Sequence, residues 1–571
     1  MTSFQQSGWP IINKYFENRH LERLVRHQIE SYNNFIKNEI KKTINMFNPV
    51  TIHSEADFDP ESGLYGLEII ITFDNFKIYR PQIHENNGAT KTMFPHEARL
   101  RNFTYSAAMK IDINIKILKR SGENLSKCES IHKKLSNINI GKMPIMLKSC
   151  ICVLTQNSHL DANLTGECRF CPGGYFIVSG SEKVVIAQER AAENRVMCFP
   201  VKKTGKWSWM AEIKSVPDFK CISPKQISVL ISSKNNGYGY SIYVQLPRIK
   251  KPIPLFILFR ALGVISDKDI CSFIILNIHT DKMKKMLYGL RASIVEASTF
   301  VTDEEALNYV IGIATSTPIN MTVEKGIQKK REFTQSVLDN DLFPHCHTKQ
   351  QKIYFLGYMI NRLLQTSFKW IPAGDRDSYN NKRIDLTGTL LNNLFRNYFN
   401  KLVKDMSKQI VKEINNGSWR TTANYINIIN QTNIYKIVKS TTIENGIKRA
   451  LATGDFGIKN TNSNKVGVAQ VLGRLTYISA LSHLRRINTP LDKSGKLIPP
   501  RKLHSTQWGF ICPVETPEGA GVGIIKNIAY LAHITIKSST TPIFDVIKDK
   551  IINIDDKEPH ELYDKVKVII N

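Results

Sequence analysis

The sequence contains no run of about 18 consecutive apolar residues, so no segment is predicted to span a membrane. Its start, MTSFQQSGWPIINKYFENRH, lacks the charged beginning and apolar centre of a secretory signal peptide. The ten cysteines are scattered along 571 residues, without the dense spacing of a disulfide framework. We therefore expect a soluble intracellular protein with reduced thiols, and the sequence does not distinguish nucleus, cytoplasm or virion.

Common catalytic and nucleotide-binding motifs are also missing. The chain has no phosphate-binding loop of the form GxxxxGK[ST], no HExxH and no GxSxG. GAGVGI (519–524) is rich in glycine, but it does not open a helix after a strand, as a dinucleotide-binding loop would. Local motifs therefore assign no catalytic residue to this chain.

Metal-binding patterns are weak. Cys168 and Cys171 form a C-x-x-C pair, and Cys150 and Cys152 stand upstream in an apolar run where both could face one way. Four thiolates could hold zinc, but buried cysteines acting as small apolar residues are the favoured interpretation. In DRDSYNNKR (375–383) the two aspartates stand among basic residues, which favours a structural turn over a metal site. We expect no metal bound by this chain.

Acidic residues are few relative to basic ones. Lys and Arg number 78 against 50 Asp and Glu, which gives a formal net charge of +28. Such an excess points to a polyanionic partner, nucleic acid first and an acidic membrane surface second. A codon bias towards Lys, Asn and Ile would produce a basic surface as well, so charge alone leaves both explanations open. No basic amphipathic segment indicates a membrane anchor.

Hydrophobic periodicity predicts a mixed α+β chain of three or four domains. Helices are expected over 20–47, over 350–415 and over 466–486. Alternating residues predict strands over 66–80 and 110–118, and a strand–turn–strand over 173–189.

Two further segments differ from their surroundings in the secondary structure that their sequence predicts. Residues 196–340 read as short strands followed by several helices, which is typical of an inserted domain. After residue 525 we expect mainly strand, ending in the alternating stretch KVKVIIN (565–571).

The strongest chemical signal is a basic segment, RRINTPLDKSGKLIPPRK (485–502), with a single acidic residue. A basic helix end would lead into a loop bounded by prolines, and such a loop can hold phosphates in a sequence-independent way. A solvated basic loop is the alternative. The candidate phosphate-binding residues are Arg485, Arg486, Lys493, Lys496, Arg501 and Lys502.

The sequence around this loop resembles a known family. GVAQVLGRLTYISALSHLRRINTPLDKSGKLIPPRKLHSTQWGFICPVETPEGAGVGIIKNIA (467–529) is similar to the fork region of the second-largest subunit of multisubunit DNA-directed RNA polymerases, the counterpart of the bacterial β subunit. Further blocks agree in the order of the family, in its nuclear, archaeal and large-DNA-virus branch. They are LVRHQIESYNNFI (24–36), MFPHEARLRNFTYSA (93–107), MPIMLKS (143–149), GGYFIVSGSEKVVIAQER (173–190), LFPH (342–345) and DRDSYNNKRIDLTGTLLNNLFR (375–396).

The resemblance implies an α+β, multidomain architecture for the N-terminal part of such a subunit. Its expected domains are the first part of the protrusion at 1–195, an inserted lobe at 196–340, the return segment of the protrusion at 341–400, the fork at 401–524 and a truncated start of the external domain at 525–571.

The resemblance also implies roles for individual residues. Gln470, His483, Arg485 and Arg486 match the fork segment that lines the channel of the DNA–RNA hybrid. The stretches 460–465 and 491–498 match the two fork loops. Glu515 matches a glutamate close to the incoming nucleotide, and it is expected to lie near the chemistry without performing it.

By the same resemblance, the activity is that of a nucleotidyltransferase complex, and this chain alone is expected to be inactive. The family's metal-binding aspartates lie in the largest subunit, so the chain would bind no cofactor, and Mg²⁺ would be held by that partner. Expected partners are the largest subunit, the missing C-terminal half of this subunit, the other polymerase subunits, the DNA template and the RNA product. The alternative is a free-standing, non-enzymatic protein of the same ancestry that binds single-stranded nucleic acid.

Overall fold

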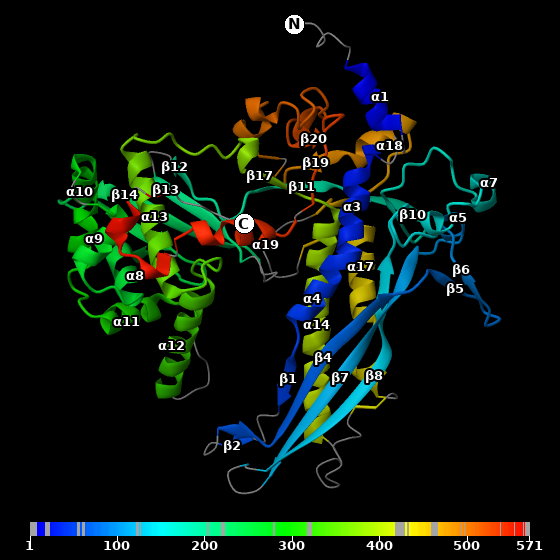
Figure 1. The fold of residues 1–571 in the computed structure, drawn as a ribbon, viewed down its shortest axis with the longest axis horizontal. Coiled ribbons are helices and arrows are strands. Elements are labelled where there is room, and N and C mark those ends of the chain that lie inside the picture. The colour runs from blue at the N-terminus through cyan, green and yellow to red at the C-terminus, as the bar shows by residue number, and fades with distance from the viewer. Residues whose placement is uncertain are drawn as a thin grey trace. The chain divides into compact units, whose positions relative to one another are not determined.

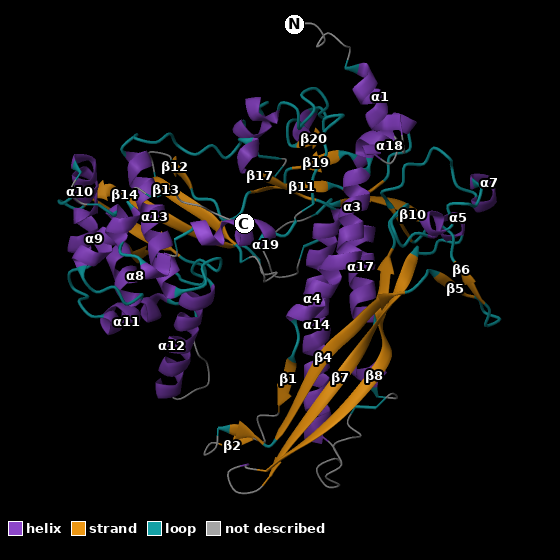
Figure 2. Cartoon of the chain, in the orientation of Figure 1, coloured by secondary structure: helices purple, strands orange, loops and turns teal. Residues whose placement is uncertain are grey.

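The computed structural model describes residues 8–565 with gaps. Residues left out within that range are 18–22, 54–57, 60–62, 122–124, 126, 202–204, 218–222, 278–279, 317–322, 417–428, 431–432, 458–465, 493, 496, 537, 553 and 564. Helices and sheets are both abundant in the described chain (Figure 2), which confirms the α+β prediction. The chain divides into two compact units: unit 1 is Met1–Arg190 with Arg383–Ile536, and unit 2 is Ala191–Lys382 with Lys537–Asn571.

Unit 1 is built on a long antiparallel sheet with the order β1-β4-β7-β8 (Figure 1). In β7 every second side chain from Ala107 to Ile117 is buried, because successive residues of a strand point to opposite faces. The predicted strands 66–80 and 110–118 are confirmed. The strands are β1 (Val50–His53), β4 (Leu67–Ile78), β7 (Ser106–Ser121) and β8 (Lys127–Pro144).

Helices cover the buried face of this sheet. Their apolar residues form one core with the inward residues of the strands, including a cluster of Phe35, Phe73, Phe395 and Phe399. The helix predicted over 20–47 is confirmed for its described residues, with a π-helical turn in the middle. The helical segments are α3 (Arg26–Asn34), η1 (Phe35–Glu39), α4 (Ile40–Met46), α14 (Thr387–Asn416), α16 (Ile434–Ile437) and α17 (Thr441–Thr453).

Two small sheets complete the framework of unit 1, with the orders β18-β10-β9 and β17-β11-β19-β20. Each brings together strands that are far apart in the sequence. The predicted strand–turn–strand over 173–189 is confirmed as β9 and β10. The strands are β9 (Phe176–Val178), β10 (Ser181–Val185), β11 (Ala187–Ala191), β17 (Lys382–Asp385), β18 (Ala469–Val471), β19 (Arg486–Asn488) and β20 (Ile525–Asn527).

The helix predicted over 466–486 is wrong in its first half. Residues 469–471 form strand β18, and only α18 (Tyr477–Leu484) is helical. The apolar spacing that suggested one helix does not mark a buried face, since Leu475 is 92% exposed and Ile478 is 75% exposed. Hydrogen bonding to β10 decides the conformation of this stretch instead.

Unit 2 packs a five-stranded antiparallel sheet against helices, and α8 is buried almost all round. It takes in the predicted inserted segment and extends beyond it at both ends. The strands are β12 (Met197–Pro200), β13 (Trp207–Ser215), β14 (Lys225–Asn235), β15 (Tyr240–Gln245) and β16 (Ile253–Pro254). The helices are α8 (Leu255–Ala261), α9 (Asp267–Ile275), α10 (Asp281–Glu296), α11 (Asp303–Ile313), α12 (Val323–Asn340) and α13 (Lys349–Ser367).

The expectation of mainly strand after residue 525 is wrong for the described residues. Beyond β20 they form helix α19 (Thr541–Ile547) and short 3-10 turns. These turns belong to unit 2 and pack on the start of α13, where Tyr354 donates to the carbonyl of Lys557 at 2.6 Å and Thr348 donates to Asp555 at 2.9 Å. The strand predicted at the end of the chain falls on 566–571, outside the described residues.

Candidate nucleic-acid interface

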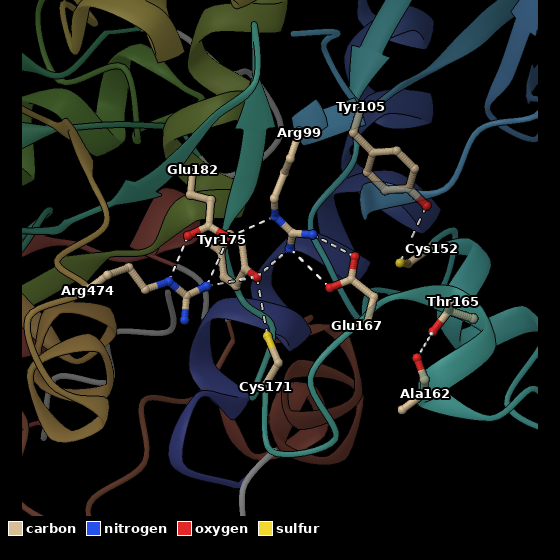
Figure 3. A network of polar contacts seen from close by, with 10 residues as sticks. All are labelled: Arg99, Tyr105, Cys152, Ala162, Thr165, Glu167, Cys171, Tyr175, Glu182 and Arg474. Atoms are coloured by element: carbon tan, nitrogen blue, oxygen red, sulfur yellow. Dashed lines mark hydrogen bonds and ion pairs between the residues drawn. The ribbon is translucent and has the colours of Figure 1, made fainter. Parts of the chain in front are cut away.

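A partly exposed charge network fixes the turn between β18 and α18 (Figure 3). Arg474 donates to both carboxylate oxygens of Glu182 on β10, at 2.7 and 2.9 Å, and Arg99 donates to the same carboxylate at 2.9 Å. Arg99 also holds Glu167 through two hydrogen bonds of 2.7 and 3.1 Å, and both arginines donate to the Tyr175 hydroxyl. Burial would raise the pKa of Glu182, but the two guanidinium groups outweigh it and lower that pKa.

The start of α18 is fixed by its own sequence. The Thr476 hydroxyl accepts from the backbone N–H of Ser479 at 3.1 Å, and the Ser479 hydroxyl accepts from the N–H of Thr476 at 3.2 Å. This reciprocal cap satisfies two backbone donors that the first turn of a helix leaves free. The cap and the arginine network together set the position of α18 relative to β10.

Gln470 and His483, both predicted site residues, are hydrogen-bonded to each other. The backbone N–H of Gly473 donates to Nδ1 of His483 at 3.0 Å, so Nδ1 must be unprotonated. The proton therefore sits on Nε2, which lies 3.0 Å from Oε1 of Gln470 and donates to it. Burial, together with the charge of Arg486, lowers the pKa of His483 to about 4. The imidazole is thus neutral near pH 7 and does not act as a phosphate-binding cation.

We expect His483 to stay neutral throughout the physiological range. Folding lowers the pKa of His483 from an ordinary value near 6.5 to about 4. The neutral imidazole therefore favours the folded state above pH 6.5, and this contribution to stability is lost as the pH falls towards 4. Histidine-selective ¹⁵N NMR, assigned with His483→Gln, should show the Nε2–H tautomer from pH 8 to pH 5. Protonation of this residue near pH 6.5 would contradict the hydrogen-bond scheme.

Arg485 is buried and holds the backbone together. Its guanidinium donates to the carbonyl oxygens of Leu24 at 2.6 Å, Ala529 at 2.7 Å and Tyr530 at 3.2 Å, with a longer contact of 3.5 Å to Ile528. The resemblance suggested that Arg485 lines a nucleic-acid channel. That role stays a prediction; in this structure the guanidinium joins the start of the N-terminal helical region to the chain after β20.

The other predicted basic residues differ in their surroundings. Arg486 is half-buried on β19 and Lys502 is exposed, and within the described residues neither side chain makes a hydrogen bond or an ion pair. Lys493 and Lys496 lie outside the described residues, as does the predicted fork loop 460–465. Arg486 and Lys502 are therefore the two described cations of the basic segment that are available to an anion.

Arg501 braces the glycine-rich loop of the GAGVGI stretch. Its guanidinium donates to the carbonyl oxygens of Ala520 at 2.7 Å, Val522 at 3.1 Å and Gly495 at 3.1 Å. Gly523 has a φ of +69°, and a Cβ there would lie 2.1 Å from the carbonyl oxygen of Arg501, so only glycine fits. The basic loop and the glycine-rich loop thus form one braced structure.

Glu515 is exposed and is tied to α18 through a single side chain. One of its carboxylate oxygens accepts a hydrogen bond from the Ser482 hydroxyl. Asn527 on β20 donates to both the hydroxyl and the carbonyl oxygens of Ser482, each at 3.0 Å. Sequence reasoning missed Ser482 and Asn527, although Ser482 stands next to the predicted His483. The fold therefore places Glu515 beside the helix that carries His483.

A buried ion pair was also missed. Lys526 on β20 lies 2.6 Å from Glu189 on β11, and their side chains are only 8% and 2% exposed. The only sequence signal is a lysine within the apolar stretch GIIKNIA. The pair joins the strand after the glycine-rich loop to the sheet of unit 1, so it helps to fix the loop that carries Glu515.

The four cysteines considered for zinc do not converge. Cys171 contacts the Tyr175 hydroxyl at 3.2 Å, whereas Cys152 contacts the Tyr105 hydroxyl at 3.5 Å (Figure 3). Among the described residues, no three His, Cys, Asp or Glu side chains gather in a way that could hold a metal ion. In the same part of the chain, no helix is long and apolar enough to cross a membrane.

Comparison with known proteins gives matches along almost the whole chain. Residues 23–445 match the family described as RNA polymerase beta subunit, and residues 470–534 match the family described as RNA polymerase Rpb2, domain 3. "DNA-directed RNA polymerase II subunit 2" of Arabidopsis thaliana is 37% identical over 99% of this chain and 46% of its own length. "DNA-directed RNA polymerase II subunit RPB2" of Schizosaccharomyces pombe is 34% identical over 100% of this chain and 46% of its own length.

An archaeal relative matches end to end. "DNA-directed RNA polymerase subunit Rpo2N" of Methanothermobacter thermautotrophicus is 31% identical over 96% of this chain and 99% of its own length. Against the eukaryotic relatives, the chain spans about half of the length of the proteins it matches. The two family matches and the braced segment between β18 and β20 agree, and the chain belongs to the family of the second-largest subunit of DNA-directed RNA polymerases.

Proposed function

We propose that the chain forms cleft wall and fork in a DNA-directed RNA polymerase and works only within that assembly. The observation that carries the proposal is that the match over residues 470–534 coincides with the segment held by Arg474, Arg485, Arg501 and Lys526. A wall beside moving strands needs a rigid backbone that presents a few side chains. We assign the protrusion and the fork to unit 1 and the lobe to unit 2.

Within the fork, the proposed roles differ between charged and neutral groups. Arg486 and Lys502 contact phosphates through charge, and the undescribed Lys493 and Lys496 belong to the same loop. Gln470 and the neutral His483, which are hydrogen-bonded to each other, form an uncharged part of the channel wall. Arg485 and Arg501 position backbone. Glu515 stands near the incoming nucleotide, with Ser482 fixing its orientation.

The proposed partners are the largest subunit, the remainder of the second-largest subunit, the other polymerase subunits, the DNA template and the RNA product. Phosphoryl transfer in this enzyme class requires metal-bound phosphates. By the family resemblance, which places the metal-binding aspartates in the largest subunit, we assign Mg²⁺ to that subunit. The residues of this chain contribute positioning of strands and nucleotide.

The isolated chain should not extend RNA on a primed template with Mg²⁺, whereas the assembly with the largest subunit and the remainder of the second-largest subunit should. Glu515→Gln in the assembly should slow incorporation while assembly is retained, as measured by gel filtration and by single-nucleotide extension. Template-dependent extension by the rigorously purified chain alone would overturn the proposal, and so would full activity of the assembly without this chain.

Arg486→Ala should weaken binding of nucleic acid to the chain similarly for all base sequences. The log–log slope of affinity against salt should fall by roughly 0.7–0.9, the value for one neutralised phosphate. Arg449→Ala, an exposed arginine on α17, is the matched control and should change binding much less. Fluorescence anisotropy at several salt concentrations measures both. A sequence-specific loss would contradict a role in contacting phosphates.

A further inference from the structure

Three tyrosines of unit 2 are strongly exposed on neighbouring elements. Tyr238 and Tyr240 lie at the turn between β14 and β15 and are 53% and 51% exposed. Tyr288 lies on α10, which packs against β15, and it is 73% exposed. Within the part of the chain that the structure describes, none of the three rings stacks on another ring, so each can offer a π face to a ligand.

The turn that carries two of these rings is held in place. The side-chain oxygen of Asn235 accepts from the N–H groups of Gly237 and Gly239, at 2.8 and 3.0 Å. Asn236 donates to the carbonyl of Ala292 on α10 at 3.3 Å. Gly239 has a φ of +133°, which favours glycine and lets the turn approach α10. The tyrosines therefore stand on a preorganised support.

The surroundings of the rings are basic. The guanidinium of Arg291 lies 5.5 Å from the centroid of the Tyr238 ring, and Arg291 follows Tyr288 by three residues on α10, so the two share a helix face. Asp281, in the first turn of α10, pairs with Lys284 at 3.0 Å. Further exposed cations on α10 and at the same end of the sheet are Lys206, Lys234, Lys282 and Lys285.

We infer that Tyr238, Tyr240, Tyr288 and Arg291 form a stacking platform for single-stranded nucleic acid. Aromatic faces within a basic surface bind single strands because unpaired bases stack on the rings while cations hold the phosphates. A duplex, whose bases already stack on each other, would gain only the phosphate contacts. This site belongs to unit 2, so it is independent of the role proposed for the fork in unit 1.

The test is binding of the full chain to a single-stranded oligouridylate of about 16 nucleotides, an upper site size for one binding module. Tyr238→Ala and Tyr288→Ala should each weaken binding about tenfold, while Tyr238→Phe and Tyr288→Phe should retain it, since stacking needs the ring and not the hydroxyl. Tyr435→Ala is the matched control, because Tyr435 is 65% exposed on α16 of unit 1. Binding of a duplex of equal length should change less than twofold.

Photocrosslinking locates the site. An oligonucleotide carrying 4-thiouridine should crosslink to peptides that contain Tyr238 and Tyr288, and it should still do so in the Arg486→Ala chain. The inference is overturned if the tyrosine-to-alanine variants bind as the unaltered chain does, or if they lose duplex binding equally. Crosslinks confined to other peptides, or capture of an acidic polypeptide in preference to the oligonucleotide, would also overturn it.

Discussion

Replacing Arg485 by alanine is expected to destabilise unit 1 by more than about 3 kcal/mol. Hydrogen bonds from a charged donor contribute about 1.5–3 kcal/mol each, and buried carbonyls that lose their donor keep the cost of desolvation. The guanidinium serves the carbonyls of Leu24, Ala529 and Tyr530 at once, so its loss loosens two distant chain segments. Hydrogen exchange should rise around residues 24–28 and 525–530, with an earlier thermal transition.

Arg486→Ala is the control for this prediction. Arg486 is the next residue, has the same charge and is half-buried, yet its side chain makes no hydrogen bond or ion pair within the described residues. Its removal should change stability by less than about 0.5 kcal/mol. If the two variants were equally stable, the carbonyl contacts of Arg485 would have no structural importance, and its role as a channel residue would regain support.

Lys526→Ala is expected to destabilise the chain by about 3–5 kcal/mol, because it removes the ammonium group that lies 2.6 Å from the buried carboxylate of Glu189. The effect should also reach the glycine-rich loop. Lys526 stands on the strand that follows the glycine-rich loop, so exchange should also rise across residues 511–524. Thermal unfolding and hydrogen exchange of the full chain measure both consequences.

The double variant Lys526→Met with Glu189→Gln separates charge from packing. Replacing both members of a buried ion pair by neutral groups of similar size is often tolerated, so most of the lost stability should return. Lys557→Ala is the control for an exposed ion pair. The side chains of Lys557 and Glu561 are 40% and 42% exposed, so removing this pair should lower the free energy of unfolding by less than about 0.5 kcal/mol. A double variant as unstable as Lys526→Ala would show that packing, not charge, is responsible.

Local sequence patterns were sufficient to predict secondary structure where apolar and polar residues alternate with the period of the strand or helix. The isoleucines of β7 alternate with polar residues, so the strand and its buried face could be predicted without knowledge of its neighbours. The same holds for the helix that contains Phe35 and Ile40, and for the hairpin of β9 and β10. The family could also be identified from the sequence alone, through the similarity of segment 467–529 to the polymerase subunits.

Patterns failed where a distant segment supplies the hydrogen bonds. The stretch from Val468 to Leu475 has helical spacing, but β10 offers an open strand edge almost 300 residues earlier, and pairing Gln470 with Val184 overrides the helical preference. The same reason explains the chain after residue 537. Its turns gain partners such as Tyr354, and no local pattern reveals those partners.

The sequence by itself therefore determined the α+β class, the main strands and helices, the excess of positive charge and the family. Only the tertiary structure decided which charges are available. Arg485 and Arg486 are adjacent and chemically alike, but one guanidinium is used up by backbone carbonyls and the other is not. The physical reason is that burial and hydrogen-bond partners come from segments such as Leu24 and Tyr530, which are remote in sequence and meet only in the fold.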